Sequence, residues 1–257
     1  MNKVKELIGM SPLHKLSIDI KARWDLSKFS DVNDQIMGYS TTYCISPYKT
    51  GTRYLTGCYR NEVSAHEPMH FLSLRELDKN FDEFFIKRLN TLNLKLECSG
   101  FFSAYIDEIA ANPLAKDLNY IIILRSPSSW ITSAVNYWDY LGKTGLQYRY
   151  PNLLFWMNKV GVNLELLLSA SEKDKIKGLE KLADFYMNFT QKTQQLNNVH
   201  YVKIDEIDSF LPVLDKLIKE TSHPEESQTH IRRKTFHYKN EELDGEYNKL
   251  VLKLTKN

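Results

Sequence analysis

The sequence predicts an α/β fold, a three-layer sandwich in which helices cover both faces of a central parallel sheet. Residues 119–125 (NYIIILR) form an almost purely apolar run, which is typical of a central parallel strand covered on both sides. Further strand candidates alternate with helical stretches along the chain, and this alternation indicates parallel βαβ connections. The weight of helical sequence over residues 127–197 predicts a helical insertion over one face of the sheet.

The expected strands and helices follow one another along the chain. Residues 41–45 are β-branched and aromatic, which suits a buried strand, and residues 92–97 alternate apolar and polar side chains. Residues 119–125 and 200–204 are the other main strand candidates, and residues 62–65 are a possible short strand. Helices are expected at residues 52–60, 72–92, 102–110, 127–140, 153–170, 174–196 and 207–221.

The composition indicates a single domain. The chain has 257 residues, of which 42% are hydrophobic and 26% charged, as in ordinary globular proteins. No linker rich in Ser, Pro or Gly divides the chain, and no repeat of fixed period is visible. Residues 41–257 are therefore expected to form one α/β domain, preceded by an N-terminal extension at residues 1–40.

Charge and cysteine usage exclude several classes of protein. The 34 Lys and Arg side chains against 32 Asp and Glu leave a net charge of +2, which argues against general nucleic-acid binding. Three cysteines without a CxxC pair argue against a disulfide framework and a cysteine-type zinc site. No apolar run approaches the roughly 20 residues that span a bilayer, and residues 1–8 lack the apolar core of a signal peptide. We expect a soluble cytoplasmic protein.

An anion-binding loop is predicted directly after the first strand, in the segment PYKTGTRYL at residues 47–55. The backbone N–H groups at the start of the following helix, together with the helix dipole, attract anions. Gly51 lets the backbone approach a ligand closely, Thr50 and Thr52 offer hydroxyl groups, and Lys49 offers a compact cation. These features predict a phosphate cradle, although a turn with an incidental lysine is the plainer interpretation.

The loop departs from the nucleoside-triphosphate motif. That motif places its lysine after the second glycine, whereas Lys49 precedes the only glycine of this loop by two residues. A kinase also needs a metal-binding carboxylate, but the strongest strand ends in Arg125, and Asp205 after the last strand is a weak substitute. A P-loop kinase of a small molecule is therefore an alternative, as is a non-catalytic nucleotide-binding scaffold.

A second anion site is predicted where residues 119–125 end. Arg125 lies at the carboxyl end of this strand, where open α/β sheets bind ligands, and a guanidinium can hold a phosphate through two parallel hydrogen bonds. Pro127 suits the first position of the next helix, and Ser133 lies about two turns into it. The alternative to a phosphate-binding role is that Arg125 forms an ion pair with a nearby carboxylate. Two anion sites on one sheet edge suit a ligand with two separated phosphates.

The two segments resemble the signature of sulfotransferases that use 3′-phosphoadenosine 5′-phosphosulfate (PAPS). The first motif of that family has the form PKSGTTWL or PKTGTT, and the second has the form R-x-P-x5-S, matched here at Arg125, Pro127 and Ser133. The resemblance covers about residues 41–140 and residues 201–207. It departs from the family at Tyr48, which is an extra residue, and at Arg53, which replaces a threonine.

The resemblance implies a P-loop-like loop that binds phosphosulfate and a set of donor-binding residues. The 5′-phosphosulfate would be held by Lys49, Thr50, Gly51, Thr52 and Arg53, and the 3′-phosphate by Arg125 and Ser133. The basic residues Arg233 and Lys234 could also bind the 3′-phosphate, as a late Arg-Lys-Gly loop does in cytosolic members, although a solvated basic turn is as good an interpretation.

The reaction implied is an in-line transfer of a sulfuryl group from PAPS to a hydroxyl or amine of a glycan, peptide or small molecule. Such a transfer needs a cation on the leaving phosphate and a base for the acceptor proton. Lys49 suits the first role, so no metal is expected. A glycan-like acceptor is favoured, because the histidine base of the aryl and steroid enzymes is missing from its usual position.

Two carboxylates compete for the role of the base. Glu67 resembles the EP or EE segment that supplies the base in carbohydrate and tyrosine sulfotransferases. Glu97 lies in a segment that resembles the E-K-[ST]-P-x-Y-F element of heparan-type enzymes, with Cys98 in place of the lysine. Glu67 is the preferred candidate and Glu97 the second, while His66 and His70 stay as further alternatives. Aromatic residues between 137 and 156 could wall an acceptor cleft, although most are expected in the core.

Overall fold

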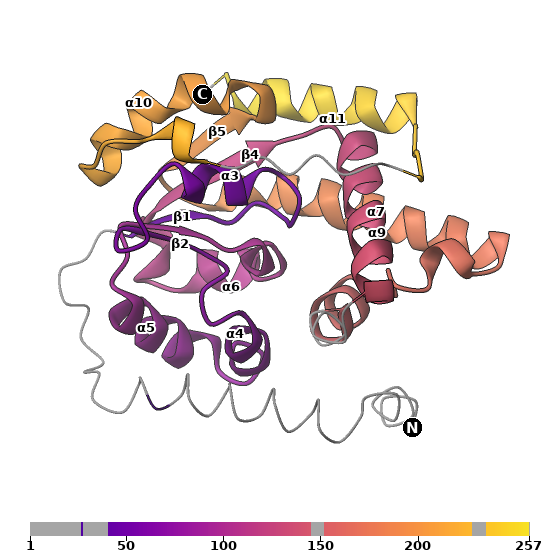
Figure 1. Ribbon diagram of the computed structural model, residues 1–257, viewed down its shortest axis with the longest axis horizontal. Coiled ribbons are helices and arrows are strands. Elements are labelled where there is room, and N and C mark those ends of the chain that lie inside the picture. The colour runs from indigo at the N-terminus through magenta and orange to yellow at the C-terminus, as the bar shows by residue number, and fades with distance from the viewer. Residues whose placement is uncertain (1–26, 28–40, 145–151, 228–234, 257) are drawn as a thin grey trace.

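The computed structural model describes residue 27 and residues 41–144, 152–227 and 235–256 (Figure 1). Within these ranges, five strands form one sheet in the order β2-β3-β1-β4-β5, and every neighbouring pair is parallel. The predicted parallel sheet is therefore confirmed. The strands are β1 (Thr42–Cys44), β2 (Ser64–His66), β3 (Leu96–Cys98), β4 (Asn119–Leu124) and β5 (Val199–Lys203).

Helices connect these strands and cover the sheet. The α-helices are α3 (Thr52–Gly57), α4 (His70–Glu76), α5 (Phe81–Leu92), α6 (Ile106–Ala111), α7 (Pro127–Thr144), α9 (Glu172–Lys192), α10 (Ile207–Ile218) and α11 (Glu241–Leu254). Asn152–Val160 (η4) is a π-helix. Short 3₁₀ turns are η1 (Gly100–Ala104), η2 (Ala115–Asp117), η5 (Leu167–Ser169), η6 (Thr193–Gln195), η7 (Ile204–Glu206) and η8 (Pro224–Glu226).

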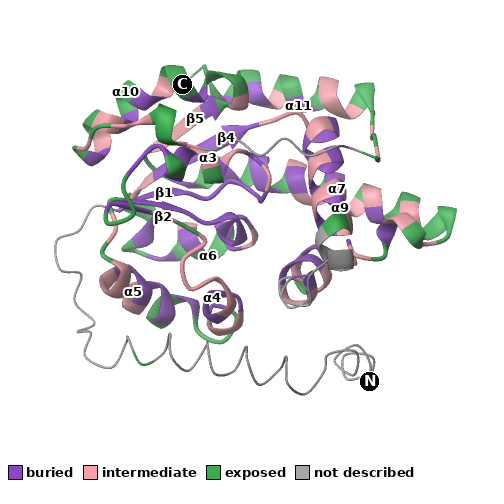
Figure 2. Ribbon diagram, viewed as in Figure 1, coloured by how far each residue is buried: buried purple, intermediate pink, exposed green. Residues whose placement is uncertain are grey.

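Alternation along the strands produces three layers. Successive side chains of a strand point to opposite faces, so Tyr43 and Ile122 join one hydrophobic cluster while Cys44 and Ile121 join the other. The first cluster includes residues of α5, α6, α7, α9 and α11, and the second includes residues of α3 and α10. Figure 2 shows β1 and β4 as buried, as expected for strands covered on both faces. The predicted three-layer sandwich is confirmed.

Several sequence predictions differ from the structure in their boundaries, and three of the differences have a local cause. The single helix expected at residues 72–92 is two helices, because the side chain of Asn80 caps α5 by accepting a hydrogen bond from the Glu83 N–H. Since α5 continues to Leu92, the strand expected at residues 92–97 is shorter and comprises only Leu96–Cys98 (β3). The helix expected at residues 153–170 stops at Val160, and the next residue, Gly161, has a left-handed φ of 79°.

The C-terminal helix α11 was not among the predicted elements. Its sequence, EELDGEYNKLVLKL, is rich in charge and contains a glycine, so its apolar residues are widely spaced. Asn240 caps the helix by accepting a hydrogen bond from the Leu243 N–H, and Tyr247 and Val251 are buried against the core. Among the described helices, none combines the length and apolar character that a bilayer crossing requires.

The strand order places a crevice beside the central strand. After β1 the chain passes to β2 and β3 on one side of the sheet, whereas after β4 it passes to β5 on the other side. The loops that follow β1 and β4 therefore diverge at the carboxyl ends of two adjacent strands. Open α/β sheets bind their ligands at such a topological switch point. Both predicted anion-binding segments lie there.

Candidate functional site

The loop after β1 is a tight turn that leads into α3. Lys49 and Gly51 both have left-handed backbone conformations, with φ values of 71° and 103°. The Thr50 hydroxyl closes the turn by donating to the carbonyl of Pro47 at 2.8 Å. A Cβ atom at Gly51 would approach Ile207 Cδ1 to 3.1 Å, so glycine relieves both the steric and the conformational constraint here. The predicted loop is thus a compact turn with a left-handed lysine.

Lys49 connects this loop to the end of β4. Its ammonium nitrogen lies 3.9 Å from the centre of the Tyr137 ring on α7. Its carbonyl oxygen accepts a hydrogen bond of 2.6 Å from Nη1 of Arg125. The two predicted anion-binding segments, which are 76 residues apart in sequence, therefore touch across the switch point.

The guanidinium of Arg125 is held by two partners and keeps further N–H donors. Its Nε donates to the Ser129 hydroxyl at 3.0 Å, and Nη1 donates to the Lys49 carbonyl. Within the described residues, Nη2 has no hydrogen-bond partner. Burial lowers the pKa of Arg125 from its ordinary value, so the partly buried cation lacks part of its hydration and would gain from an anionic ligand.

Ser129 is a candidate site residue that the sequence reasoning missed. The predicted partner of Arg125, Ser133, lies one turn further along α7 and makes no hydrogen bond to Arg125. Residues four apart share one face of a helix, so Ser129 and Ser133 lie on the same side of α7. The sequence did contain a signal for this contact, namely the four-residue spacing from Arg125 to Ser129, which spans the start of α7.

Glu67 occupies a constrained turn at the carboxyl end of β2. Both Glu67 and Met69 are non-glycine residues with left-handed φ values, 52° and 51°. Oε1 of Glu67 accepts a hydrogen bond of 2.7 Å from the Gly100 N–H. Any side chain at Gly100 would collide with the Tyr48 backbone, because a Cβ there would lie 2.7 Å from the Tyr48 nitrogen. This close packing fixes the position of the carboxyl group.

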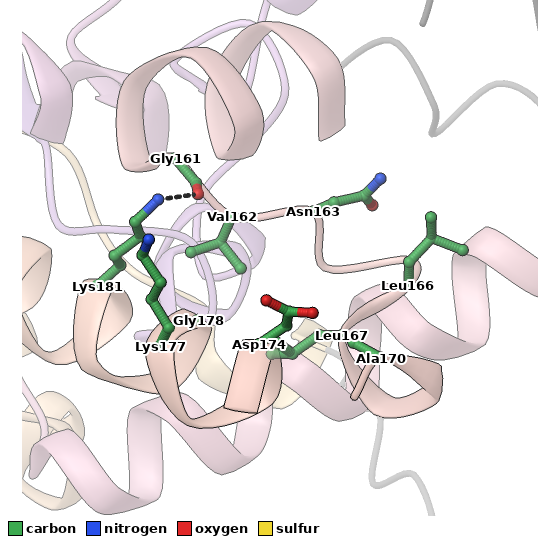
Figure 3. A pocket seen from close by; sticks show the side chains of 10 residues that line it. All are labelled: Gly161, Val162, Asn163, Leu166, Leu167, Ala170, Asp174, Lys177, Gly178 and Lys181. Atoms are coloured by element: carbon green, nitrogen blue, oxygen red, sulfur yellow. Dashed lines mark hydrogen bonds between the residues drawn. The ribbon is translucent and has the colours of Figure 1, made fainter. Parts of the chain in front are cut away.

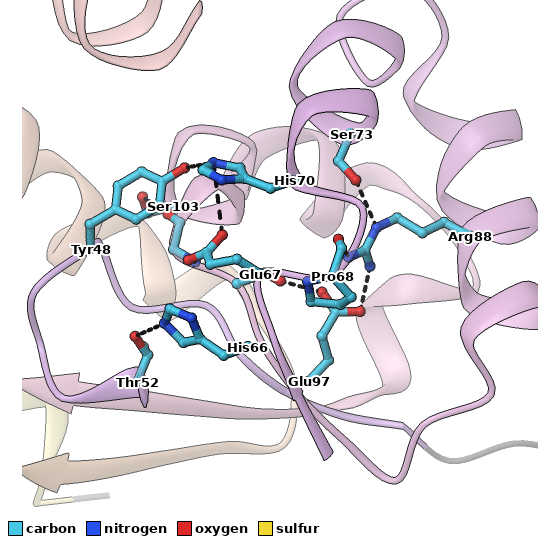
Figure 4. A network of polar contacts seen from close by, with 12 residues as sticks. Tyr48, Thr52, His66, Glu67, Pro68, His70, Ser73, Arg88, Glu97 and Ser103 are labelled. Atoms are coloured by element: carbon cyan, nitrogen blue, oxygen red, sulfur yellow. Dashed lines mark hydrogen bonds and ion pairs between the residues drawn. The ribbon is translucent and has the colours of Figure 1, made fainter. Parts of the chain in front are cut away.

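The second oxygen of Glu67 is buried and has no hydrogen-bond partner in the described part of the chain. Nε2 of His70 lies 4.0 Å from it and is 2.6 Å from the Tyr48 hydroxyl (Figure 4). Burial, with a smaller contribution from the charge of Glu97, raises the pKa of Glu67 to about 8, against the opposing effect of the Gly100 N–H. An acid–base group whose pKa lies near neutrality suits proton transfer.

Glu97 has a different environment, since it is fully buried and paired. Its carboxylate accepts hydrogen bonds from Nη1 of Arg88 and from the Ser99 hydroxyl, the latter at 2.5 Å. Arg88 also donates to the Ser73 hydroxyl and to the carbonyl of Pro68, at 2.9 and 2.8 Å (Figure 4). The pair thus braces the turn that carries Glu67. This geometry favours Glu67 over Glu97 as the candidate base, because Glu67 keeps one oxygen without a hydrogen-bond partner in the described residues.

His66 marks the side of the site where positive charge gathers. Its Nε2 lies 3.2 Å from the Thr52 hydroxyl. Surrounding protein, and then the positive charges of Arg53 and Lys49, lower the pKa of His66 to about 4, although the residue as a whole is exposed to solvent. His66 is therefore neutral at pH 7, and the two cations lie close enough to the end of β2 to act on it.

The remaining predicted residues divide between the core and the undescribed segments. Arg233 and Lys234 lie outside the described residues. Trp138, Phe155 and Trp156 are buried and pack around Tyr48, with ring centres 4.8–6.1 Å from its own. The prediction that most of these aromatic residues belong to the core is confirmed for them, whereas Tyr140 is exposed and Tyr137 contacts Lys49.

One hollow of about 310 Å³ lies away from this site. It is formed by the segment after η4 and the first turns of α9, and Lys177, Lys181 and Asp174 are among its polar residues (Figure 3). None of the predicted site residues lines it. The ammonium of Lys181 is already bound to the carbonyl of Gly161 at 2.8 Å.

Comparison with known proteins gives one structural similarity. No protein-family model matches the sequence, and no curated protein matches it. The structure is similar to the crystal structure of a sulfotransferase from Alicyclobacillus acidocaldarius, with 16% sequence identity and a TM-score of 0.42, over 85% of this chain and 95% of the other. A similarity at this level carries no inference about activity, which depends on the chain's own side chains.

Proposed function

We propose that the protein transfers a sulfuryl group from PAPS to a hydroxyl or amine of an acceptor, with a glycan-like acceptor favoured. The observation that carries the proposal is the hydrogen bond from Arg125 to the carbonyl of Lys49. It joins the two motif-bearing segments at the switch point of the sheet, so that one ligand with two separated phosphates can contact both. The constrained, buried carboxyl group of Glu67 adds a candidate base to the same sheet edge.

The donor would be held at both ends. The 5′-phosphosulfate falls to Lys49 and to the residues that follow it, namely Thr50, Gly51, Thr52 and Arg53. The 3′-phosphate falls to Arg125 and Ser133, with Ser129 holding the guanidinium. The contact between Lys49 and Tyr137 does not prevent this role, because a cation–π contact is worth about 0.5–1 kcal/mol and a charge-assisted hydrogen bond to phosphate about 1.5–3 kcal/mol.

The chemical step is an in-line displacement at sulfur. In its ionised form, which is the minor form at pH 7 for a carboxyl group with a pKa of about 8, Glu67 accepts the proton of the acceptor O–H or N–H while the acceptor atom forms its bond to sulfur. The bond between sulfur and the 5′-phosphate oxygen breaks, and the electron pair goes to that oxygen, where the charge of Lys49 stabilises it. The products are the sulfated acceptor and adenosine 3′,5′-bisphosphate. We place this activity in the cytoplasm, in keeping with a chain of three cysteines without a CxxC pair.

Calorimetry with nucleotides tests the donor assignment. Adenosine 3′,5′-bisphosphate should bind at least tenfold more tightly than AMP, because AMP leaves Arg125 without a phosphate and a charged hydrogen bond is worth about 1.5–3 kcal/mol. ATP serves as the comparison for a kinase. Equal affinities for the bisphosphate and AMP, or a clear preference for ATP, would contradict the proposal.

A further inference from the structure

The backbone of Arg125 is held by a buried hydroxyl from a distant helix. The Tyr186 hydroxyl on α9 donates to the carbonyl oxygen of Arg125 at 2.9 Å and accepts from the N–H of the same residue at 3.2 Å. A phenol can do both, because it carries one donor and free lone pairs. Tyr186 is 1% exposed, so water does not compete for these contacts.

Arg125 needs this help because it lies between two regular elements. β4 ends at Leu124, where the pairing with Lys203 of β5 is the last in the sheet, and α7 begins only at Pro127. The N–H and carbonyl of Arg125 therefore belong to neither the sheet nor the helix. Buried backbone groups without partners are costly, and Tyr186 satisfies both of them.

The ring of Tyr186 is itself fixed by aromatic neighbours. It stacks on Trp130 of α7, with ring centres 4.4 Å apart and planes inclined by 19°. It also stacks on Tyr247 of α11, with ring centres 5.5 Å apart. Nε1 of Trp130 donates to the carbonyl of Tyr48, so the same stack also contacts the loop that carries Lys49. Helices α7, α9 and α11 thus meet at the joint between β4 and α7.

We infer that Tyr186 is a positioning residue that orients Arg125 toward the second phosphate of the nucleotide. Tyr186 fixes the main chain of Arg125, while Ser129 and the Lys49 carbonyl fix its guanidinium. The inference rests on the proposed function, since it assigns the second phosphate to Arg125. Loss of a residue with this role should reduce the part of the nucleotide affinity that the second phosphate contributes, and it should leave the binding of the first phosphate unchanged.

The variant Tyr186→Phe tests this role, because it removes the hydroxyl and keeps the ring in its stack. Titration calorimetry should show the affinity for adenosine 3′,5′-bisphosphate falling by about tenfold, the loss expected for a disturbed charged hydrogen bond. The affinity for AMP should stay within about twofold, since AMP lacks the second phosphate. The ratio of the two affinities is the readout, and a general loss of stability does not change it selectively.

Tyr120→Phe is the matched control. Tyr120 is a buried tyrosine on β4 whose hydroxyl donates to the carbonyl of Ala115 at 2.6 Å, so the variant loses one buried hydrogen bond in the same strand. Its thermal stability should fall while its nucleotide ratio stays that of the wild type. If Tyr186→Phe does not fold, Tyr247→Phe replaces it, because the Tyr247 hydroxyl lies 3.5 Å from that of Tyr186. In Tyr247→Phe, the ratio of the affinity for the bisphosphate to the affinity for AMP should fall at least twofold.

The outcomes separate the two hypotheses. A wild-type protein without preference for the bisphosphate over AMP contradicts the proposed function, whatever the variants do. A wild-type preference that Tyr186→Phe retains, or that Tyr247→Phe retains if it is used instead, overturns only the positioning role. A ratio that falls equally in Tyr120→Phe also overturns it, because the effect then follows from the loss of any buried tyrosine hydroxyl near β4.

Discussion

Glu67 has a backbone conformation that a non-glycine residue adopts only under constraint. Its φ of 52°, together with that of Met69, costs about 1 kcal/mol or more for each residue, and such costs are concentrated at functional sites. The turn is held from both sides, by the Gly100 N–H on the carboxyl group and by Arg88 on the carbonyl of Pro68. The surrounding structure therefore keeps the carboxyl group in a place that local preference would not choose.

Replacement of Glu67 by Gln should separate binding from turnover. The amide keeps the shape of the side chain and loses its basicity, so turnover should fall by roughly 10²–10⁴-fold while the affinity for PAPS stays nearly unchanged. Turnover would be measured with an acceptor found by screening glycans, with calorimetry for the nucleotide. If the variant retains most of its turnover, the base is another group: Glu97 if Glu97→Gln loses its turnover, and His66 or His70 if both variants remain active.

The raised pKa of Glu67 also predicts a dependence of stability on pH. The folded protein keeps the proton up to about pH 8, whereas the unfolded chain releases it near pH 4.5. The folded state therefore binds more protons between these values, and stability falls as the pH rises through this range. The contribution is fully present below about pH 4.5 and is lost as the pH passes 8.

Urea unfolding of the wild type and of Glu67→Gln from pH 5 to pH 9 measures this effect. The difference in unfolding free energy between the two proteins should shift steadily in favour of the variant as the pH rises, because Gln cannot ionise. A difference that stays constant over the range would show that the Glu67 carboxyl titrates normally.

At the scale of elements, one buried ion pair joins three pieces of secondary structure. Arg88 of α5 pairs with Glu97 of β3, and both side chains are 1% exposed. Arg88 also binds Ser73 of α4 and the turn between β2 and α4. A charge left without its partner in such a place is far more costly than the intact pair is favourable.

Glu97→Gln should therefore act on stability more than on chemistry. The variant leaves the Arg88 charge buried without a counter-charge, and its unfolding free energy at pH 7 should fall by about 3 kcal/mol. Urea unfolding measures the loss, and the double variant Arg88→Met with Glu97→Leu should recover much of it. A stable Glu97→Gln protein without turnover would reverse the roles assigned to the two carboxylates.

At the scale of the whole molecule, the site depends on sheet topology. Neither of the two predicted anion-binding segments is complete alone, because the loop after β1 supplies Lys49 and the joint after β4 supplies Arg125. The central place of β1 between β3 and β4 makes the two segments neighbours. Ligand binding should therefore stabilise the fold as a unit.

Thermal unfolding with added nucleotide tests this coupling. At a concentration about one hundred times its dissociation constant, adenosine 3′,5′-bisphosphate should stabilise the protein by about 2.7 kcal/mol. AMP at the same concentration should stabilise it less, since it binds more weakly. The Arg125→Ala variant should show equal shifts with both nucleotides, and a larger shift with the bisphosphate in that variant would place the second phosphate elsewhere.

The sequence by itself determined the features that depend on neighbours along the chain. The apolar run of β4, the loop around Lys49 and the proline that opens α7 are local patterns, because strand propensity, turn geometry and helix starts act over a few residues. These local patterns were sufficient to predict the layer architecture and to locate the two segments at the switch point of the sheet.

Only the tertiary structure decided which side chains meet. Ser129 rather than Ser133 contacts Arg125, Glu97 finds its partner in Arg88, and the Tyr186 hydroxyl reaches the end of β4 from 61 residues away. Burial of Glu67, which raises its pKa, likewise comes from segments distant in sequence. The physical reason is that pairing and desolvation depend on how helices pack against the sheet, and no local pattern encodes that packing.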